Sequence, residues 1–443
     1  MAMAFLESAA DIGAGLLLPC VLFLAGVYFT RYLGGFYLRH PLLTARRMLG
    51  GGRSRAGAFR ALSVSLAGTL GVGNIVGVGV AIALGGAGAL FWMWLSALFS
   101  MIVKYAEIVL AMRYKVYERG RFLGGPMYYM RDGVGGALGR VMACGFAALG
   151  VLSALAMGNM VQMNAAATAL SSAMGVPRAI LGVLGALLCV LLLTRGFEGI
   201  SRVTAVVIPV ISLAYVLLSL RVLVCEAARL PAVFAEILRG AFDVRAASGG
   251  TLGFFLTGAF RQGVAKGAFS HEAGCGTAAM AHAGAERVRP AEQGTLGIFE
   301  VFFDTVVLCT LTGLVILLAC DGAPVTENGM HLVIYSFSRY YGRRAAYLIS
   351  VGIVLFALAT VVCWGYYGKL CLQYLVHSPI APAVYDLIYS AAVIPAAVMT
   401  ESAVWSLSDL MTAWMTVLNL SALLMLRRAV RAETVSAGLC LPR

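Results

Sequence analysis

Charged residues are scarce in this sequence. Of its 443 residues, only 12% are Asp, Glu, Lys or Arg, while 61% are hydrophobic. Soluble domains carry about 25% charged residues. The chain therefore has too few charges to cover the roughly three soluble domains that its length suggests. Its apolar composition also excludes a disordered chain, a collagen-like repeat and a disulfide scaffold. These deficits together indicate a polytopic membrane protein.

The sequence also has no paired cysteines and does not begin with a segment typical of a signal peptide. None of the ten cysteines stands in a CxxC motif, so the sequence suggests neither a resident metal nor redox chemistry. The first ten residues have no basic segment and contain Glu7, which argues against a cleaved signal peptide. The net charge of +13 does not indicate a nucleic-acid partner, because the basic residues cluster between apolar runs.

Long apolar runs recur along the chain. A helix needs about 20 mainly apolar residues to cross the hydrocarbon core, and only helices satisfy the backbone in lipid over such lengths. We therefore predict an all-α polytopic membrane protein with about 11 transmembrane helices. The expected spans are residues 12–32, 60–86, 88–112, 139–173, 177–195, 203–225, 253–282, 294–320, 344–375, 380–399 and 403–426.

The distribution of arginine predicts the orientation of these spans. The segments near 226–250 and 321–343 are expected to be loops of mixed charge, whereas the basic residues gather in other connections, at 39–60, 113–121, 195–202, 283–293 and 427–443. The positive-inside rule places such basic segments in the cytoplasm. We therefore expect the N-terminus outside and the tail 427–443 in the cytoplasm. Short loops and the lack of a targeting segment favour the lipid bilayer of a bacterial inner membrane.

Glycine interrupts two predicted spans near their middle. The second span contains Gly71-Val-Gly-Asn-Ile-Val-Gly77, and the seventh is rich in glycine and polar residues over 263–276. After the first helix, each interrupted span opens a set of five helices, at 60–225 and 253–426. An odd number of helices gives the two sets opposite orientations. This pattern predicts a broken-helix transporter with a midplane site, although close helix packing through small residues is an alternative interpretation.

Polar side chains inside the apolar spans are candidates for that site. Asn159 and Gln162 share one helix face, as do Thr360 and Trp364. A hydroxyl can coordinate Na⁺ and an indole can wall a small side chain, whereas interhelical packing is the alternative for both pairs. Asp304 is a further candidate for a pathway or supporting role, because carboxylates inside membranes are costly.

Charged residues inside the predicted spans are also assigned roles. Lys104 and Glu107 stand three residues apart near the inner end of the third span, so we predict a structural ion pair between them or snorkelling of their side chains. Glu272 lies inside the second interruption, where a carboxylate needs a partner or water. It is expected to hold the break together with Lys266 or Arg261, or to line the pathway.

Seven segments together resemble a known family, the sodium:alanine/glycine symporters, also called alanine or glycine:cation symporters. They occur in order along nearly the whole chain, which makes the resemblance specific. The segments are LGVGNIVG at 70–77, FWMWLSAL at 91–98, KYAE at 104–107, GGPMYY at 124–129, GNMVQ at 158–162, FSHEAG at 269–274 and WGYYG at 364–368.

The resemblance implies a LeuT-type fold and a function. The fold is a 5+5 inverted repeat preceded by one extra N-terminal helix, in a single transporter domain over 1–443. The implied function is Na⁺-driven symport of alanine or glycine by alternating access, with no covalent chemistry and no organic cofactor. The implied substrate-binding residues are Gly71, Val72, Gly73, Asn74, Gln162, Phe269, Ser270 and Trp364. The implied cation ligands are the carbonyls of Ala67 and Leu70 and the hydroxyl of Thr360.

The chain departs from the family pattern at four positions. Val72 stands where threonine is frequent, and Ala359 removes a second hydroxyl beside Thr360. His271 replaces a common asparagine, and Lys369 stands where an acid is usual. Proton coupling through a histidine is therefore an alternative to Na⁺ coupling. The residues are also compatible with a non-transporting amino-acid sensor, a channel or a membrane-embedded enzyme.

Overall fold

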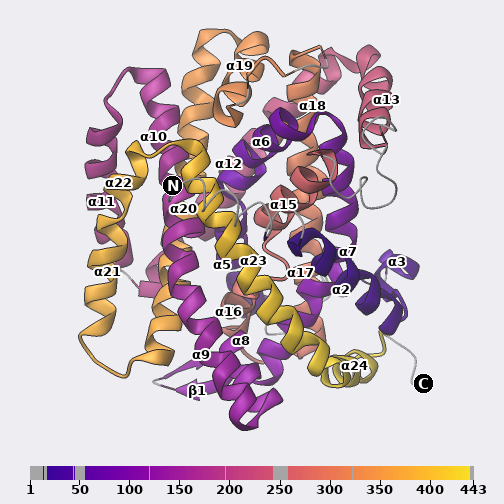
Figure 1. Ribbon diagram of the computed structural model, residues 1–443, viewed down its shortest axis with the longest axis vertical. Helices are drawn as coiled ribbons and strands as arrows, with labels where there is room; N and C mark the ends of the chain where they lie inside the picture. The colour runs from indigo at the N-terminus through magenta and orange to yellow at the C-terminus, as the bar shows by residue number, and fades with distance from the viewer. Residues whose placement is uncertain are drawn as a thin grey trace.

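The computed structural model describes residues 13, 17–42, 44, 55–118, 120–194, 196–242, 258–321, 324–326 and 328–439. Over this part of the chain the fold is helical apart from one short hairpin, formed by β1 (Val116–Glu118) and β2 (Arg121–Leu123), which pair antiparallel. The helices run roughly along the long axis of the molecule, with α24 and the hairpin at one end and α13 and α19 at the other (Figure 1).

The first half of the chain contains one interrupted helix and several long ones. α2 and α3 precede it, and α5 and α6 are separated by a 3₁₀ turn at Val72–Asn74. The helices are α2 (Leu18–Tyr32), α3 (Phe36–Arg39), α5 (Arg55–Thr69), α6 (Val76–Gly85), α7 (Gly88–Arg113), α8 (Pro126–Tyr129), α9 (Gly136–Ser153), α10 (Val161–Met174), α11 (Arg178–Leu193) and α12 (Gly196–Cys225). π-Helical segments at Met130–Val134 and Ala154–Met160 flank α9.

The second half repeats the interruption. α15 and α16 are separated by residues 272–276, and a π-helical segment at Phe302–Cys309 joins α17 to α18. A short 3₁₀ turn at Ala227–Arg229 leads into α13. The helices are α13 (Leu230–Ala241), α15 (Gly258–His271), α16 (Thr277–Ala283), α17 (Pro290–Val301), α18 (Thr310–Ala319), α19 (Gly329–Tyr341), α20 (Arg343–Leu375), α21 (Ala381–Ala391), α22 (Val393–Val398), α23 (Glu401–Met425) and α24 (Arg427–Ser436).

Every predicted span falls on helix in the described part of the chain. Seven helical stretches there are long and apolar enough to cross a membrane: 88–113, 136–174, 206–225, 290–319, 347–375, 381–398 and 401–425. The spans at 12–32 and 177–195 correspond to α2 and α11, and the two interrupted spans correspond to α5 with α6 and to α15 with α16. Residues 12, 14–16 and 253–257 of these spans lie outside the described part. The repeat boundaries at 60–225 and 253–426 stay a prediction.

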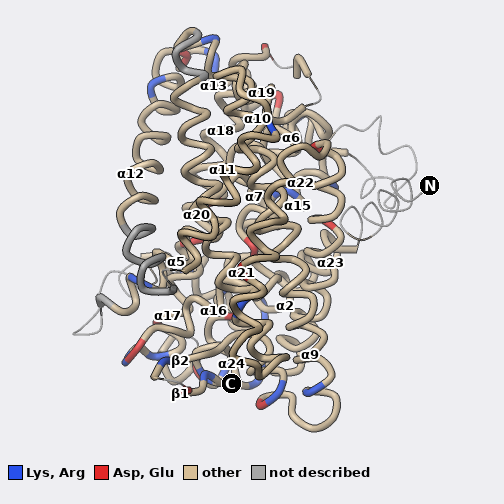
Figure 2. Tube along the Cα trace, turned by 90° about the vertical axis from the view of Figure 1, so that its left-hand side faces the viewer, with Lys and Arg blue, Asp and Glu red and all other residues tan. Residues whose placement is uncertain are grey.

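Charge is distributed as a membrane protein requires. Most of the charged residues coloured in Figure 2 lie at the two ends of the molecule, around α13 at one end and around the hairpin and α24 at the other. The belt between them is largely uncharged. Because charged side chains are costly in hydrocarbon, this belt is the part that fits the bilayer core.

Two segments expected to be loops contain helices. α13 lies within the segment 226–250, and α19 lies within 321–343. On α13, Val233, Ile237 and Ala241 recur every four residues and are buried, and the helix packs against α7. Both helices are too short to span a bilayer, so the search for long apolar runs misses them. The expectation of loops is therefore wrong for α13 and α19.

Candidate functional site

The two interrupted helices lie against each other at their breaks. The Asn74 amide in the first break donates a hydrogen bond to the Ser270 hydroxyl at the second, over 2.9 Å. Gly73 lies against the Phe269 ring so closely that a Cβ on this glycine would be 3.0 Å from the ring. All four residues are buried. The structure thus brings two segments that are about two hundred residues apart into one core region.

Side chains satisfy the backbone of the first break. Gly71 is extended and its N–H donates to Asn74 Oδ1 over 3.1 Å, while the Val72 N–H donates to Gln162 Oε1 over 3.0 Å. A Cβ at Gly71 would be 2.5 Å from Thr360 Oγ1 and 3.0 Å from Gln162 Oε1. Only glycine therefore allows α10 and α20 to approach the break this closely. Five of the predicted site residues meet here.

Two charged side chains on α7 cap the second break. Lys104 Nζ donates to the carbonyl of His271, at the C-terminal end of α15, over 2.7 Å. Glu107 Oε1 accepts from the N–H groups of Gly274 and Gly276, just before α16, over 2.9 and 3.1 Å. A cation at a helix C-terminus and an anion at a helix N-terminus both interact favourably with the helix dipole. The polar ends of the broken helix are therefore stabilised inside the membrane.

The predicted ion pair between Lys104 and Glu107 is wrong. Lys104 pairs with Glu300 on α17, with 2.9 Å between Nζ and Oε1, because both α7 residues turn to the polar groups of the break. Glu300 also accepts hydrogen bonds from Ser65 and Thr69 on α5. It lies 3.2 Å from the His282 ring on α16. Glu300 thus links both broken helices. It was not among the residues predicted from the sequence, although a carboxylate inside an apolar span is a signal in itself.

Glu272 connects the second break to α20. Its carboxylate accepts from the Trp364 indole N–H over 2.8 Å and from the Thr277 hydroxyl over 2.5 Å. The expected pairing with Lys266 is wrong, because the Lys266 ammonium pairs with Asp409 on α23 at 2.7 Å. Glu272 has a φ of 54°, a left-handed conformation that is uncommon outside glycine. The break therefore stores backbone strain beside the predicted pocket wall.

A cluster of oxygen atoms lies between the breaks and the helix formed by α17 and α18. Asp304 Oδ1 accepts from the Asn74 amide over 2.6 Å, and Oδ2 accepts from the hydroxyls of Ser270 and Thr305 over 2.9 and 2.8 Å. Asp304 is fully buried, and no basic side chain of the described residues lies within ion-pair distance of it. A buried carboxylate without a positive partner is costly, which marks Asp304 as a functional candidate.

Two of the three predicted cation ligands meet at a second group of oxygen atoms. The Thr360 hydroxyl on α20 donates to the carbonyl of Ala67 at 3.1 Å, so these two predicted ligands meet. Leu70, the third, is buried and directly follows the end of α5. Trp364 lies one turn further along α20, packed on Gly158, where a Cβ would be 2.1 Å from the tryptophan side chain. The face shared by Thr360 and Trp364 therefore points to the broken helices.

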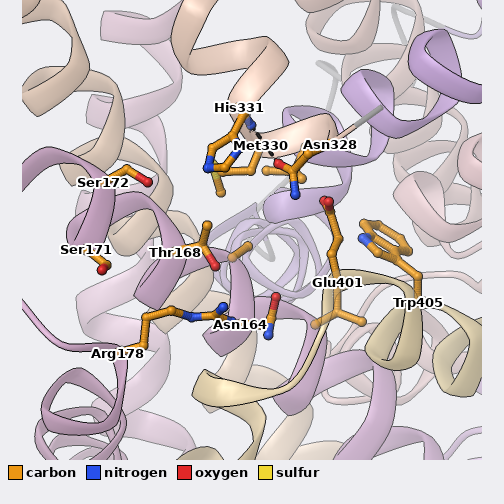
Figure 3. A pocket seen from close by; sticks show the side chains of 13 residues that line it. Asn164, Thr168, Ser171, Ser172, Arg178, Asn328, Met330, His331, Glu401 and Trp405 are labelled. Carbon is orange, nitrogen blue, oxygen red and sulfur yellow. Dashed lines mark hydrogen bonds between the residues drawn. The ribbon is translucent and has the colours of Figure 1, made fainter. Parts of the chain in front are cut away.

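A cavity of about 220 Å³ lies beyond the breaks, on the side of α19 (Figure 3). Val76 and Trp405 belong to its lining, and the Trp405 ring contacts the Phe269 ring with 4.6 Å between centroids. Arg178 and Glu401 also line it, and Figure 3 shows them projecting from different elements around the same space. Trp405 therefore belongs both to the cavity lining and to the contact with Phe269 beside the second break.

The whole chain matches one protein family. The sodium:alanine symporter family matches over residues 1–436. This protein belongs to that family. It is a multi-pass membrane transporter of an amino-acid:cation symporter family and not an enzyme.

Two similar proteins have symporter names, and one solved structure has the same fold. The sodium/alanine symporter AgcS of Methanococcus maripaludis is 36% identical over 381 residues, which are 85% of this chain and 83% of that protein. The probable sodium/glutamine symporter GlnT of Bacillus subtilis is 34% identical, covering 94% of this chain and 86% of that protein. The structure of MhsT in complex with L-phenylalanine superposes with a TM-score of 0.60 at 14% identity, over 87% of this chain and 99% of MhsT. This likeness confirms the predicted LeuT-type fold.

The capping role of Glu107 in this symporter predicts a graded loss of stability. Glu107→Leu leaves two buried backbone N–H groups without an acceptor, which costs about 2–6 kcal/mol in total. Glu107→Gln keeps one acceptor oxygen and should cost clearly less. Thermal unfolding of the purified protein in detergent measures both. Glu433→Gln, which removes a partly exposed pair with Arg113, is the control and should change stability by less than about 1 kcal/mol. Equal losses for Leu and Gln at position 107 would contradict the capping role.

Proposed function

We propose that this protein is a Na⁺-coupled symporter that takes up small neutral amino acids, alanine or glycine, by alternating access. The observation that carries the proposal is the pair of facing helix breaks bordered by two oxygen clusters, one of which contains the unpaired carboxylate of Asp304. The family and the sodium/alanine symporter among the relatives support the same substrate and ion.

The substrate carboxylate would bind the first break. The N–H groups of Gly71 and Val72 are aimed at Asn74 Oδ1 and Gln162 Oε1. These side-chain oxygens are stand-ins for a carboxylate, because a substrate can replace them at the same donors by small side-chain rotations. Phe269 and Trp364 would enclose the apolar side chain, with Trp364 oriented by its hydrogen bond to Glu272.

The cation would be held by oxygen atoms. The carbonyls of Ala67 and Leu70 with the Thr360 hydroxyl form one proposed site, and Asn74, Ser270 and Asp304 form another. Hard cations prefer carbonyl, hydroxyl and carboxylate oxygens. The Asp304 carboxylate would supply the charge and the ligand that Val72 and Ala359 do not.

The surroundings of His271 favour Na⁺ over protons. Its Nδ1 accepts the N–H of Ala273 over 3.0 Å, which requires an unprotonated Nδ1 and hence a neutral ring. Its Nε2 has no hydrogen-bond partner among the described residues. A ring that must give up this backbone contact to gain a proton is poorly placed as a proton carrier.

Asn74 offers a physical route for coupling. Its Oδ1 accepts from Gly71, and its amide donates to Asp304. A cation beside Asp304 attracts the Asn74 oxygen, and this movement frees the Gly71 N–H for the substrate carboxylate. Cation and substrate would then stabilise the same state of the site, which is what coupling requires.

The orientation proposed from the arginine clusters gives an access route. The end with the hairpin and α24 would face the cytoplasm of a bacterial cell, and the end with α13 and α19 would face outside. The 220 Å³ cavity would then open to the outside, and the contact between Phe269 and Trp405 would close the site below it.

Uptake into liposomes tests the function directly. The purified protein is reconstituted, and labelled alanine is measured under an inward Na⁺ gradient and, in parallel, under a proton gradient. Accumulation driven by Na⁺ is expected. Accumulation driven only by protons would contradict the proposal that Na⁺ is the coupling ion. Saturable alanine binding without accumulation would indicate a sensor, and uptake that neither saturates nor accumulates would indicate a channel.

Asp304→Asn should weaken the response to Na⁺. The variant keeps the size and one acceptor but loses the negative charge, and a charge-assisted ligand is worth about 1.5–3 kcal/mol, or roughly tenfold or more in affinity. The Na⁺ concentration for half-maximal alanine uptake should rise accordingly. Asp386→Asn, which removes the carboxylate paired with Lys369, is the control and should behave as wild type. An unchanged Na⁺ dependence in Asp304→Asn would exclude Asp304 from the cation site.

Trp364→Ala should reduce the preference for small substrates. Removing the indole opens space beside the breaks, so larger neutral amino acids should compete with alanine about tenfold better relative to wild type. Trp364→Phe keeps an aromatic wall but loses the hydrogen bond to Glu272, and its selectivity should stay closer to wild type. Competition of labelled alanine uptake by glutamine and methionine measures both. An unchanged profile in Trp364→Ala would remove this residue from the pocket.

A further inference from the structure

A second cavity lies at the end of the molecule that carries the β-hairpin. It has a volume of about 320 Å³ and lies between the hairpin, the beginning of α9 and the end of α20. Three arginines line it, Arg121, Arg131 and Arg140, together with His377. Glu118 is the carboxylate among its lining residues. The cavity is therefore basic, and none of its lining residues belongs to the helix breaks.

Two of the three guanidinium groups are held in fixed positions. Arg131 lies over the rings of Tyr128 and Tyr374, with 5.2 and 5.9 Å to the ring centroids. Its Nε and Nη2 donate to the carboxylate of the adjacent Asp132 over 2.7 and 2.8 Å. Arg121 Nη2 donates to the Gln373 side chain over 3.1 Å. A guanidinium has five N–H donors, so both arginines keep donors for a further acceptor.

The third arginine, Arg140, has no partner among the described residues. Arg140 makes no hydrogen bond or ion pair with any residue that the structure describes. Counting Glu118 and Asp132 against the three arginines leaves an excess of one positive charge around the cavity, without His377. This arrangement suits a group with one negative charge and several acceptor oxygens, and a phosphodiester is such a group.

An apolar path leads away from the arginines. Leu123 and Leu370 line the cavity and are buried, so its inner part is apolar. On α9, Val141, Cys144, Ala148 and Leu152 are exposed at intervals of three or four residues, and Val141 and Leu152 are 70% and 51% exposed. This stripe begins beside Arg140 and continues along the helix into the uncharged belt. A free anion would not contact this apolar stripe, whereas the acyl chains of a lipid would pack against it.

We propose that this cavity binds the headgroup phosphate of an anionic glycerophospholipid, with the acyl chains along the exposed face of α9. Arg121, Arg131 and Arg140 would bind the phosphate oxygens, and Tyr128 and Tyr374 would hold Arg131 toward it. Basic pockets between transmembrane helices are suited to such headgroups. The proposal does not depend on which ion or amino acid is transported, because it concerns a different part of the molecule.

Binding of a defined lipid tests the proposal. Full-length protein purified in detergent is titrated with palmitoyl-oleoyl-phosphatidylglycerol, and native mass spectrometry counts the bound lipid. Parallel arms contain the matching phosphatidylcholine or millimolar inorganic phosphate as competitor. Each arginine removed near an anionic lipid should weaken binding about fivefold, so Arg131→Gln combined with Arg140→Gln should lose about 25-fold. Arg428→Gln, an exposed arginine at the same end but outside the cavity, is the matched control and should bind as wild type.

Each outcome decides the matter. Selective binding of phosphatidylglycerol that is lost in the double variant and kept in the control supports the proposal. Equal binding of phosphatidylglycerol and phosphatidylcholine, or wild-type affinity in the double variant, overturns it. Displacement of the lipid by inorganic phosphate shows a site for small anions and also overturns it. If the double variant misfolds, Arg140→Gln alone carries the test, since Arg140 supports no described contact, and Arg140→Lys should retain most of the binding.

Discussion

Inside hydrocarbon no water satisfies the ends of an interrupted helix, so each break in this protein needs side chains that take over the free N–H and C=O groups. At the second break, Lys104 and Glu107 on α7 perform this task. At the first break, the side-chain oxygens of Asn74 and Gln162 accept hydrogen bonds from the N–H groups of Gly71 and Val72. The breaks, and with them every candidate ligand for substrate or cation, depend on these buried hydrogen bonds.

The four buried carboxylates near the breaks differ in the groups that donate hydrogen bonds to them. Glu300 has the Lys104 ammonium, and Glu107 has two backbone N–H groups at a helix start. Glu272 has the Trp364 indole and the Thr277 hydroxyl. Asp304, like Glu107 and Glu272, is buried and has only neutral donors, but its donors Asn74 and Ser270 come from both breaks. A bound cation is the partner that would compensate this last charge, which is why Asp304 stands at the centre of the proposed coupling.

The proposed site would resemble its own occupied state before a ligand binds. Side-chain oxygens of Asn74 and Gln162 lie where the substrate carboxylate is proposed to bind, and the Thr360 hydroxyl meets the Ala67 carbonyl at the proposed cation site. A ligand would then replace side-chain oxygens at donors that are already in position, and its binding would not require new order in the site. A site of this kind needs little reorganisation on binding, and small rotations at Asn74 and Gln162 can decide between the two states.

Local patterns in the sequence were enough for the spans, the two breaks and the helix face shared by Thr360 and Trp364, because run length, glycine and helical spacing are local properties. The pairing of charges was not accessible in this way. Spacing placed Lys104 beside Glu107, yet Lys104 pairs with Glu300, almost two hundred residues away. Local patterns also do not predict α13 and α19, because only packing against long helices stabilises such short ones. Tertiary structure alone decided these features, since a buried charge goes to whichever neighbouring helix offers it a partner.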